Sequence, residues 1–190
     1  MARYSSKAWR NWTPQNATPA RALAVPVACR VLGLDPGSLR TGYGIIDCSA
    51  SGERHLASGV IRVTGADLSQ RLRCIFEAVT LLVAEHQPQE IAIERVFVHR
   101  NPDSALKLGQ ARGVALCAAV SLGAAAHEYA PRAIKLAVSG YGGADKTQVA
   151  TMITNLLTLP RAPPADAADA LAVALCHAYG RRLLALGAAR

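Results

Sequence analysis

The stretch CRVLGLDPGSLRTGYGIIDCS, residues 29–49, decides the fold class. Its first seven residues, CRVLGLD, form a short apolar run that ends on Asp35, which is typical of a buried strand. Residues 36–44, PGSLRTGYG, are rich in glycine and predict a turn. The following IIDCS, residues 45–49, predicts a second strand. We therefore expect two consecutive strands, with an acidic side chain where the first one ends.

The rest of the body alternates strands and helices. Short apolar runs predict three more strands, at 55–64, 90–94 and 126–130. Apolar residues at spacings of three and four predict a helix over 67–86 with Asp67 as its N-cap. Further helices are expected over 104–122, 131–140 and 144–159, and in a last helix that opens near Asp166. This order predicts an α/β fold with a mixed five-stranded sheet flanked by helices.

Length and charge divide the 190 residues into a body and two ends. The net charge is +8, but residues 1–30 contain five of the 21 basic residues and none of the 13 acidic ones, so residues 31–190 carry only +3. We expect residues 1–29 to be a basic, disordered extension, although their composition also fits an organelle transit peptide. Residues 30–181 form the predicted domain, and residues 182–190 a basic tail. A basic balance suits a polyanionic partner.

The cysteines and the hydrophobic runs exclude several classes. The five cysteines are odd in number and form no C-x-x-C pair, which indicates free thiols in a reducing compartment rather than disulfides or a zinc site. Charges or glycines interrupt the apolar runs before they reach the length of a membrane span. We expect a cytoplasmic protein that has no membrane contact.

Two predicted strands end on carboxylates, Asp35 and Glu94. In open α/β sheets, functional sites form at the carboxyl ends of the strands. Each acid also has a simpler explanation, because Asp35 precedes Pro36 in a turn and Glu94 can pair with Arg95.

A second pair of acids, Asp166 and Asp169, opens the last predicted helix. Residues three apart lie on the same face of a helix, so these like charges repel. One acid in the first turn would satisfy the helix dipole, so helix capping alone accounts for one of them. The alternative is a cation site.

If these segments meet, four carboxylates share one pocket. Their mutual repulsion would amount to several kcal/mol per pair at about 4 Å in a surface-like dielectric. Divalent cations resolve that conflict, and a ligand set made only of oxygen favours Mg²⁺ or Mn²⁺ over zinc. Two such ions can support an in-line displacement at phosphorus, which is nuclease chemistry.

Three motifs carry a resemblance to a known family. The segments VLGLDPGSLRTGYGIID (31–47), AIERVFVHRNPDSALKLGQARG (92–113) and ADAADALAVALCH (165–177) closely resemble the RuvC family of bacterial Holliday junction resolvases. The similarity runs from about Val31 to about Tyr179. It implies a ribonuclease H-like fold and a homodimer that resolves four-way DNA junctions by paired symmetric nicks, leaving 5′-phosphate and 3′-hydroxyl ends, in recombination and DNA repair.

The same resemblance assigns roles to single residues. It implies that Asp35, Glu94, Asp166 and Asp169 are catalytic and bind two Mg²⁺ ions per subunit, for which Mn²⁺ can substitute. It further implies cooperation with the RuvA–RuvB branch-migration complex. A helix bearing Gly109 and Gly113 resembles the dimer-interface helix of the family, although close packing inside one chain would explain these glycines equally well.

DNA-binding residues are expected on a loop and on two helices. In the loop after Glu94, Phe97 matches the family aromatic that stacks at the opened crossover, and Arg95 and Arg100 flank it. Lys135 and Lys146 match basic residues near the active site of the family and would hold phosphate. The simpler alternatives are that Phe97 is a core residue at the base of its loop and that the lysines are ordinary surface residues.

The sequence also offers two alternative functions. The segment LDPGSLRTGYG resembles the first phosphate loop of the actin and sugar-kinase superfamily, but this chain is short for a two-domain ATPase and lacks the second glycine-rich loop. A catalytically silent junction-binding protein would be favoured by the loss of one carboxylate, and all four are present.

Overall fold

The computed structural model describes residues 28–95 and 102–188, and the predicted N-terminal extension lies almost wholly outside them. The strands are β1 (Cys29–Asp35), β2 (Arg40–Ser49), β3 (Gly52–Arg62), β4 (Glu90–Glu94) and β5 (Ala125–Tyr129). The helices are α1 (Leu68–His86), α2 (Pro102–Val120), α3 (Pro131–Ser139), α4 (Lys146–Leu156) and α5 (Ala165–Ala188).

The five strands form one mixed sheet in the order β3-β2-β1-β4-β5. The first three strands are antiparallel neighbours, whereas β4 runs parallel to both β1 and β5. The predicted α/β fold with a mixed five-stranded sheet is therefore confirmed. Since β1 lies at the centre and pairs in parallel with β4, the acidic ends of these two strands meet at one edge.

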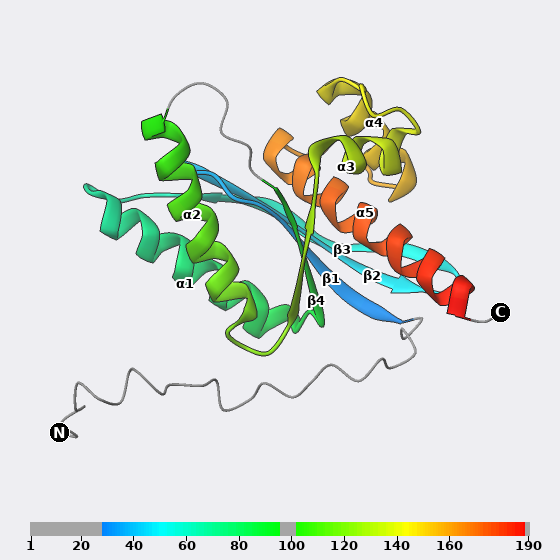
Figure 1. The fold of residues 1–190 in the computed structure, drawn as a ribbon, viewed down its shortest axis with the longest axis horizontal. Helices are drawn as coiled ribbons and strands as arrows, with labels where there is room; N and C mark the ends of the chain where they lie inside the picture. The colour runs from blue at the N-terminus through cyan, green and yellow to red at the C-terminus, as the bar shows by residue number, and fades with distance from the viewer. Residues whose placement is uncertain (1–27, 96–101, 189–190) are drawn as a thin grey trace.

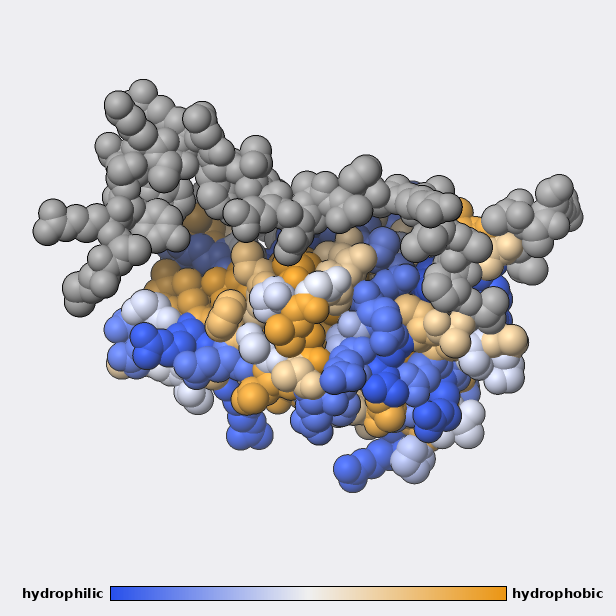
Figure 2. Space-filling view, turned by 90° about the horizontal axis from the view of Figure 1, so that it is seen from below, coloured by the Kyte–Doolittle hydropathy of each residue, from blue (hydrophilic) through white to orange (hydrophobic). Residues whose placement is uncertain are grey.

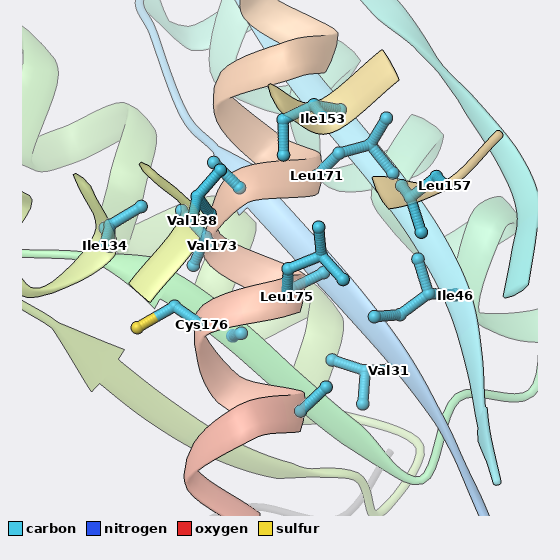
Figure 3. Packing of buried hydrophobic residues seen from close by; sticks show 14 of the residues in the cluster. Val31, Ile46, Ile134, Val138, Ile153, Leu157, Leu171, Val173, Leu175 and Cys176 are labelled. Atoms are coloured by element: carbon cyan, nitrogen blue, oxygen red, sulfur yellow. The ribbon is translucent and has the colours of Figure 1, made fainter. Parts of the chain in front are cut away.

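Helices cover both faces of the sheet, with α1 and α2 on one side and α3, α4 and α5 on the other (Figure 1). Alternation along β1 produces this division, because Val31 packs toward α5 whereas Leu32 and Leu34 pack toward α1 and α2. Figure 3 shows Leu175 of α5 near Ile46 and Val31 of the strands, and Leu171 of the same helix beside Leu157. The sheet thus has a hydrophobic core on each face.

Several predicted boundaries differ from the observed ones. The second strand begins at Arg40 rather than at residue 45, because the glycines that suggested a turn lie inside the strand beneath α5. The third strand is Gly52–Arg62, shifted from 55–64. The second helix is Pro102–Val120, two residues earlier than expected. These differences are corrections to the ends of elements and leave their order unchanged.

The C-terminal segment continues the last helix. Residues 182–188, expected to belong to a basic tail, are the last turns of α5. Arg182 pairs there with Glu53 of β3, at 2.9 Å between Nη2 and Oε1. This pair attaches the end of the helix to the sheet.

Smaller features agree with the sequence. Asp67 caps α1, its side chain accepting a hydrogen bond from the backbone N–H of Gln70 at 2.8 Å. All five cysteines are free thiols, as expected. No helix within the described residues is long and apolar enough to cross a membrane. Figure 2 shows hydrophobic residues exposed among hydrophilic ones on one face, and large exposed side chains include Leu81 and Leu122.

Candidate active site

The parallel pairing of β1 with β4 brings two carboxylates to one edge of the sheet. Val31 is level with Glu90 and Leu34 with Ile93, so the last residues of the two strands, Asp35 and Glu94, lie at the same end. In both cases, a short apolar run that ends on an acid predicted a strand with a carboxylate at its end.

Glycines in β1 and β2 allow α5 to lie directly on the strands. A Cβ atom at Gly42 would lie 1.9 Å from the carbonyl oxygen of Asp166, and one at Gly33 would lie 2.0 Å from that of Ala170. Such close approach of two backbones requires glycine at the contact. Because Gly42 is paired with Asp35 across β1 and β2, the first turn of α5 lies beside the end of β1.

The four predicted carboxylates therefore converge from β1, β4 and α5, and they interact electrostatically. Burial raises the pKa of Asp35 to about 7, helped by the negative charges of Asp169, Glu94 and Asp166. Burial and the charge of Asp169 likewise raise the pKa of Glu94. The end of the sheet thus holds an excess of negative charge that the chain itself does not fully neutralise.

Three cations partly offset this charge. Lys146, the first residue of α4, donates a hydrogen bond to Asp169 with 2.9 Å between Nζ and Oδ2, and this bond raises the pKa of Lys146. The positive charge of Lys135 in α3 acts against the rise in the pKa of Glu94 but does not cancel it. Arg40 lies 4.0 Å from Asp166, between Nη1 and Oδ2.

Sequence reasoning missed Arg40, because it assigned this residue to a turn. The antiparallel pairing of the first two strands could have indicated its position, because this pairing places the start of β2 next to the end of β1.

Of the three predicted loop residues, only Arg95 lies within the described part of the chain. Arg95 is exposed, and its Nε lies 3.8 Å from Glu128 Oε2 on β5 rather than pairing with Glu94. Its backbone N–H donates to the carbonyl of Tyr129 at 2.8 Å, which extends the β4–β5 pairing by one residue. Phe97 and Arg100 lie outside the described residues.

A second polar cluster lies at the other end of β4, and sequence reasoning missed it because its members are far apart in the chain. Glu90, His127 and His177 have ligand atoms within 4.8 Å of one another. Among the described residues, no other group of three or more potential metal ligands is this compact, so the four carboxylates are spread more widely. Arg181 Nε lies 2.7 Å from Glu90 Oε2, and His177 is hydrogen-bonded to Glu90 and Tyr129. Glu90, His177 and Tyr129 are therefore joined by hydrogen bonds, and Arg181 places a positive charge beside Glu90.

The acidic cluster, in contrast, has the chemistry that a hard divalent cation requires. All of its donors are carboxylate oxygens, and the pKa of Asp35 is raised by burial and by the repulsion of its acidic neighbours, both of which a bound cation would offset. The donor set therefore fits Mg²⁺ or Mn²⁺, as the sequence predicted.

A mixed sheet with acids at the ends of its central strands, covered by a helix that contributes further acids, defines a nuclease of the ribonuclease H-like class. Residues 31–177 match the family model for the crossover junction endodeoxyribonuclease RuvC, and the chain belongs to this family.

Relatives and solved structures agree with this assignment. The chain is 55% identical over 149 residues to the crossover junction endodeoxyribonuclease RuvC of Marinobacter nauticus, a match that covers 78% of this chain and 85% of the relative. It is 54% identical over 157 residues to the enzyme of Dichelobacter nodosus, covering 83% and 89%. Thermus thermophilus RuvC in complex with a Holliday junction substrate matches with a TM-score of 0.76 and 34% identity, covering 82% of this chain and 97% of that one.

Proposed function

We propose that this chain is a metal-dependent, structure-selective endonuclease that resolves Holliday junctions by paired symmetric nicks in recombination and DNA repair. The observation that carries the proposal is that a RuvC-family chain keeps four carboxylates in electrostatic contact at one end of its sheet. The similarity to a RuvC that was solved with a Holliday junction supports the choice of substrate. A two-domain ATPase is not supported, because the family match covers residues 31–177.

The proposed metal ligands are Asp35, Glu94, Asp166 and Asp169, which would hold two Mg²⁺ ions per subunit, with Mn²⁺ as a substitute. Bound there, the ions supply Lewis-acid activation of water and neutralise charge at the reacting phosphate. Two features of Asp35 support this assignment, namely its burial and the three acidic side chains near it. Both make its negative charge unfavourable, and a bound cation would offset that electrostatic cost. Helix capping by Asp166 and Asp169 is then secondary.

The basic residues have separate roles in this proposal. Lys146 positions Asp169 through their hydrogen bond and, with Lys135, presents positive charge to the DNA phosphates. Hydrolysis at this site would leave a 5′-phosphate and a 3′-hydroxyl, ends that a ligase can rejoin. Arg95 and Arg100 would hold the backbone while Phe97 stacks on an unpaired base, a contact worth about 1–3 kcal/mol.

The chain would act as a homodimer, and the surface of α2 supports this. Gly109 and Gly113 are exposed, and apart from the adjacent residues and the backbone of the helix itself, no atom of the described residues lies within 4 Å of the position that a Cβ would take at either glycine. Packing inside the chain therefore does not explain them. Leu106, three residues before Gly109, is 62% exposed on the same helix. Two copies related by a twofold axis would match the twofold symmetry of a four-way junction.

Two further parts of the proposal rest on family membership. The chain would cooperate with the RuvA–RuvB branch-migration complex, and it would act in the cytoplasm on bacterial DNA.

The test is cleavage of an end-labelled four-way junction with a mobile core, in Mg²⁺, in Mn²⁺ and in EDTA. A linear duplex of the same sequence is the control substrate. The proposal predicts metal-dependent nicks at symmetric positions in two opposite strands, with the duplex left intact and the nicks sealed by ligase. Tight junction binding without cleavage in any metal would instead indicate a catalytically silent binding protein.

A further inference from the structure

Two arginines lie directly opposite each other on the β2–β3 hairpin. Arg40, the first residue of β2, is paired with Arg62, the last residue of β3. Both residues are exposed, and the side chain of Arg40 is 72% exposed. Like charges directly opposite in an antiparallel pair destabilise a sheet. No carboxylate of the described residues forms an ion pair with Arg62, so the cost of this pairing is not offset there.

This arginine pair lies beside the candidate active site. Paired residues of neighbouring strands point to the same face, and residues two apart in a strand share a face. Gly42, two residues after Arg40, faces the first turn of α5 at Asp166. Arg40 and Arg62 therefore point to the α5 side of the sheet, next to the start of that helix. The 4.0 Å contact between Arg40 and Asp166 agrees with this position.

The backbone that carries Arg40 is held in place. The carbonyl of Leu39 accepts a hydrogen bond from the N–H of Val63 at 3.0 Å, which closes the end of the hairpin next to Arg62. Thr41 is fully buried, and its hydroxyl lies 3.4 Å from the carbonyl oxygen of Gly37. The two guanidinium groups thus extend from a fixed edge into solvent.

We propose that Arg40 and Arg62 form a binding site for the phosphodiester backbone of the DNA strand that enters the active site. This inference rests on the proposed function and adds a contact that is separate from Lys135 and Lys146, because it comes from the β2–β3 hairpin rather than from α3 and α4. A phosphate between two guanidinium groups removes their repulsion and accepts charge-assisted hydrogen bonds from both.

The test compares Arg40→Ala/Arg62→Ala with the matched control Arg54→Ala. Arg54 lies near the other end of the same hairpin, its side chain is also 72% exposed, and it also contacts an aspartate, Asp47, at 3.0 Å. Affinity for a fluorescently labelled four-way junction is measured by anisotropy over a series of salt concentrations in EDTA. The double variant should bind roughly tenfold more weakly at about 0.1 M salt, and its plot of log affinity against log salt should be shallower by about two units.

Further variants and outcomes separate this inference from the proposed function. Arg40→Lys/Arg62→Lys should keep most of the wild-type salt dependence, because it keeps both charges. A double alanine variant with the same slope as Arg54→Ala would refute the arginine site and leave the proposed function intact. Absence of junction binding by the wild type would contradict the proposed function itself. Thermal melting of each variant verifies that it is folded.

Discussion

Glu90 and Glu94 are the first and last residues of β4, and their environments shift the pKa of the two side chains in opposite directions. At Glu90, burial acts to raise the pKa, but the hydrogen bond from His177 and the charge of Arg181 outweigh it and lower the pKa. At Glu94, burial and the charge of Asp169 raise the pKa. One short strand therefore has a satisfied acid at one end and an unsatisfied acid at the other.

This contrast distinguishes a structural polar cluster from the proposed metal site. At the Glu90 end, hydrogen bonds join the acid, the histidine and the tyrosine, and the arginine forms an ion pair with the acid; these contacts attach α5 to the sheet. At the Glu94 end, carboxylates outnumber the cations that reach them, so the protein keeps a charge imbalance that an external cation can correct. Stored electrostatic repulsion of this kind is typical of a catalytic site.

The largest expected effect is on catalysis at the unsatisfied end. Asp35→Asn should reduce the rate of junction cleavage by at least about 10²–10³-fold, because it removes a preorganised charge at the reaction centre. Gel quantification of single-turnover cleavage in Mg²⁺ measures this, with Glu85→Gln on the exposed face of α1 as the control. Cleavage by Asp35→Asn within a few-fold of the wild-type rate would show that Asp35 is not part of the reaction centre.

The next effect is on stability at the satisfied end. Glu90→Gln should lower the free energy of unfolding by about 3 kcal/mol, because it leaves the buried Arg181 without its counter-charge. Chemical denaturation followed by circular dichroism measures this loss. The cleavage rate per folded molecule should stay near that of the wild type, and a large fall in that rate would mean that the two ends are not functionally separate.

The pH dependence of stability should report the raised pKa of Asp35, which burial and the repulsion of the neighbouring acids cause together. In EDTA, Asp35 holds its proton more tightly in the folded protein, where its pKa is about 7, than in the unfolded chain, where it is 3.8. Stability is therefore greatest below about pH 4 as far as this group is concerned, and it falls as the pH rises through 7. Asp35→Asn should remove this loss and make the metal-free protein about 4 kcal/mol more stable than the wild type at pH 8. Identical pH profiles for the two proteins in denaturation experiments would show that the pKa of Asp35 is not raised.

The smallest effect is expected at the exposed ion pair. Lys146→Gln should change the free energy of unfolding by less than about 1 kcal/mol, because its side chain is 80% exposed and such pairs are weak. Junction cleavage should still fall, since Lys146 donates a hydrogen bond to Asp169 and is proposed to hold phosphate. A cleavage rate equal to that of the wild type would make Lys146 an ordinary surface lysine.

The sequence predicted the unsatisfied end better than the satisfied one, and the reason is local. Asp35 and Glu94 each follow a short apolar run, and Asp166 and Asp169 share one helical turn, so each acid could be placed by its neighbours in the chain. The cluster of Glu90, His127 and His177 comes from three separate elements, and only the pairing of β4 with β5 and the packing of α5 bring it together.

The glycines explain the remaining errors. Gly42 and Gly44 predicted a turn because they are the residues that turns favour, but here they provide the space in which α5 lies against β2. This contact sets the start of β2, the position of Arg40 and the position of Asp166, and it depends on tertiary packing that no local pattern contains.

The central claim is that the metal binds at the Glu94 end of β4. Its most direct test is to measure the Mn²⁺ affinity of the wild type, Asp35→Asn and Glu90→Gln by electron paramagnetic resonance or isothermal titration calorimetry. The account predicts that the wild type binds Mn²⁺, that Asp35→Asn binds it much more weakly, and that Glu90→Gln retains wild-type affinity. Retained binding in Asp35→Asn together with lost binding in Glu90→Gln would place the metal at the wrong end of β4 and contradict the account.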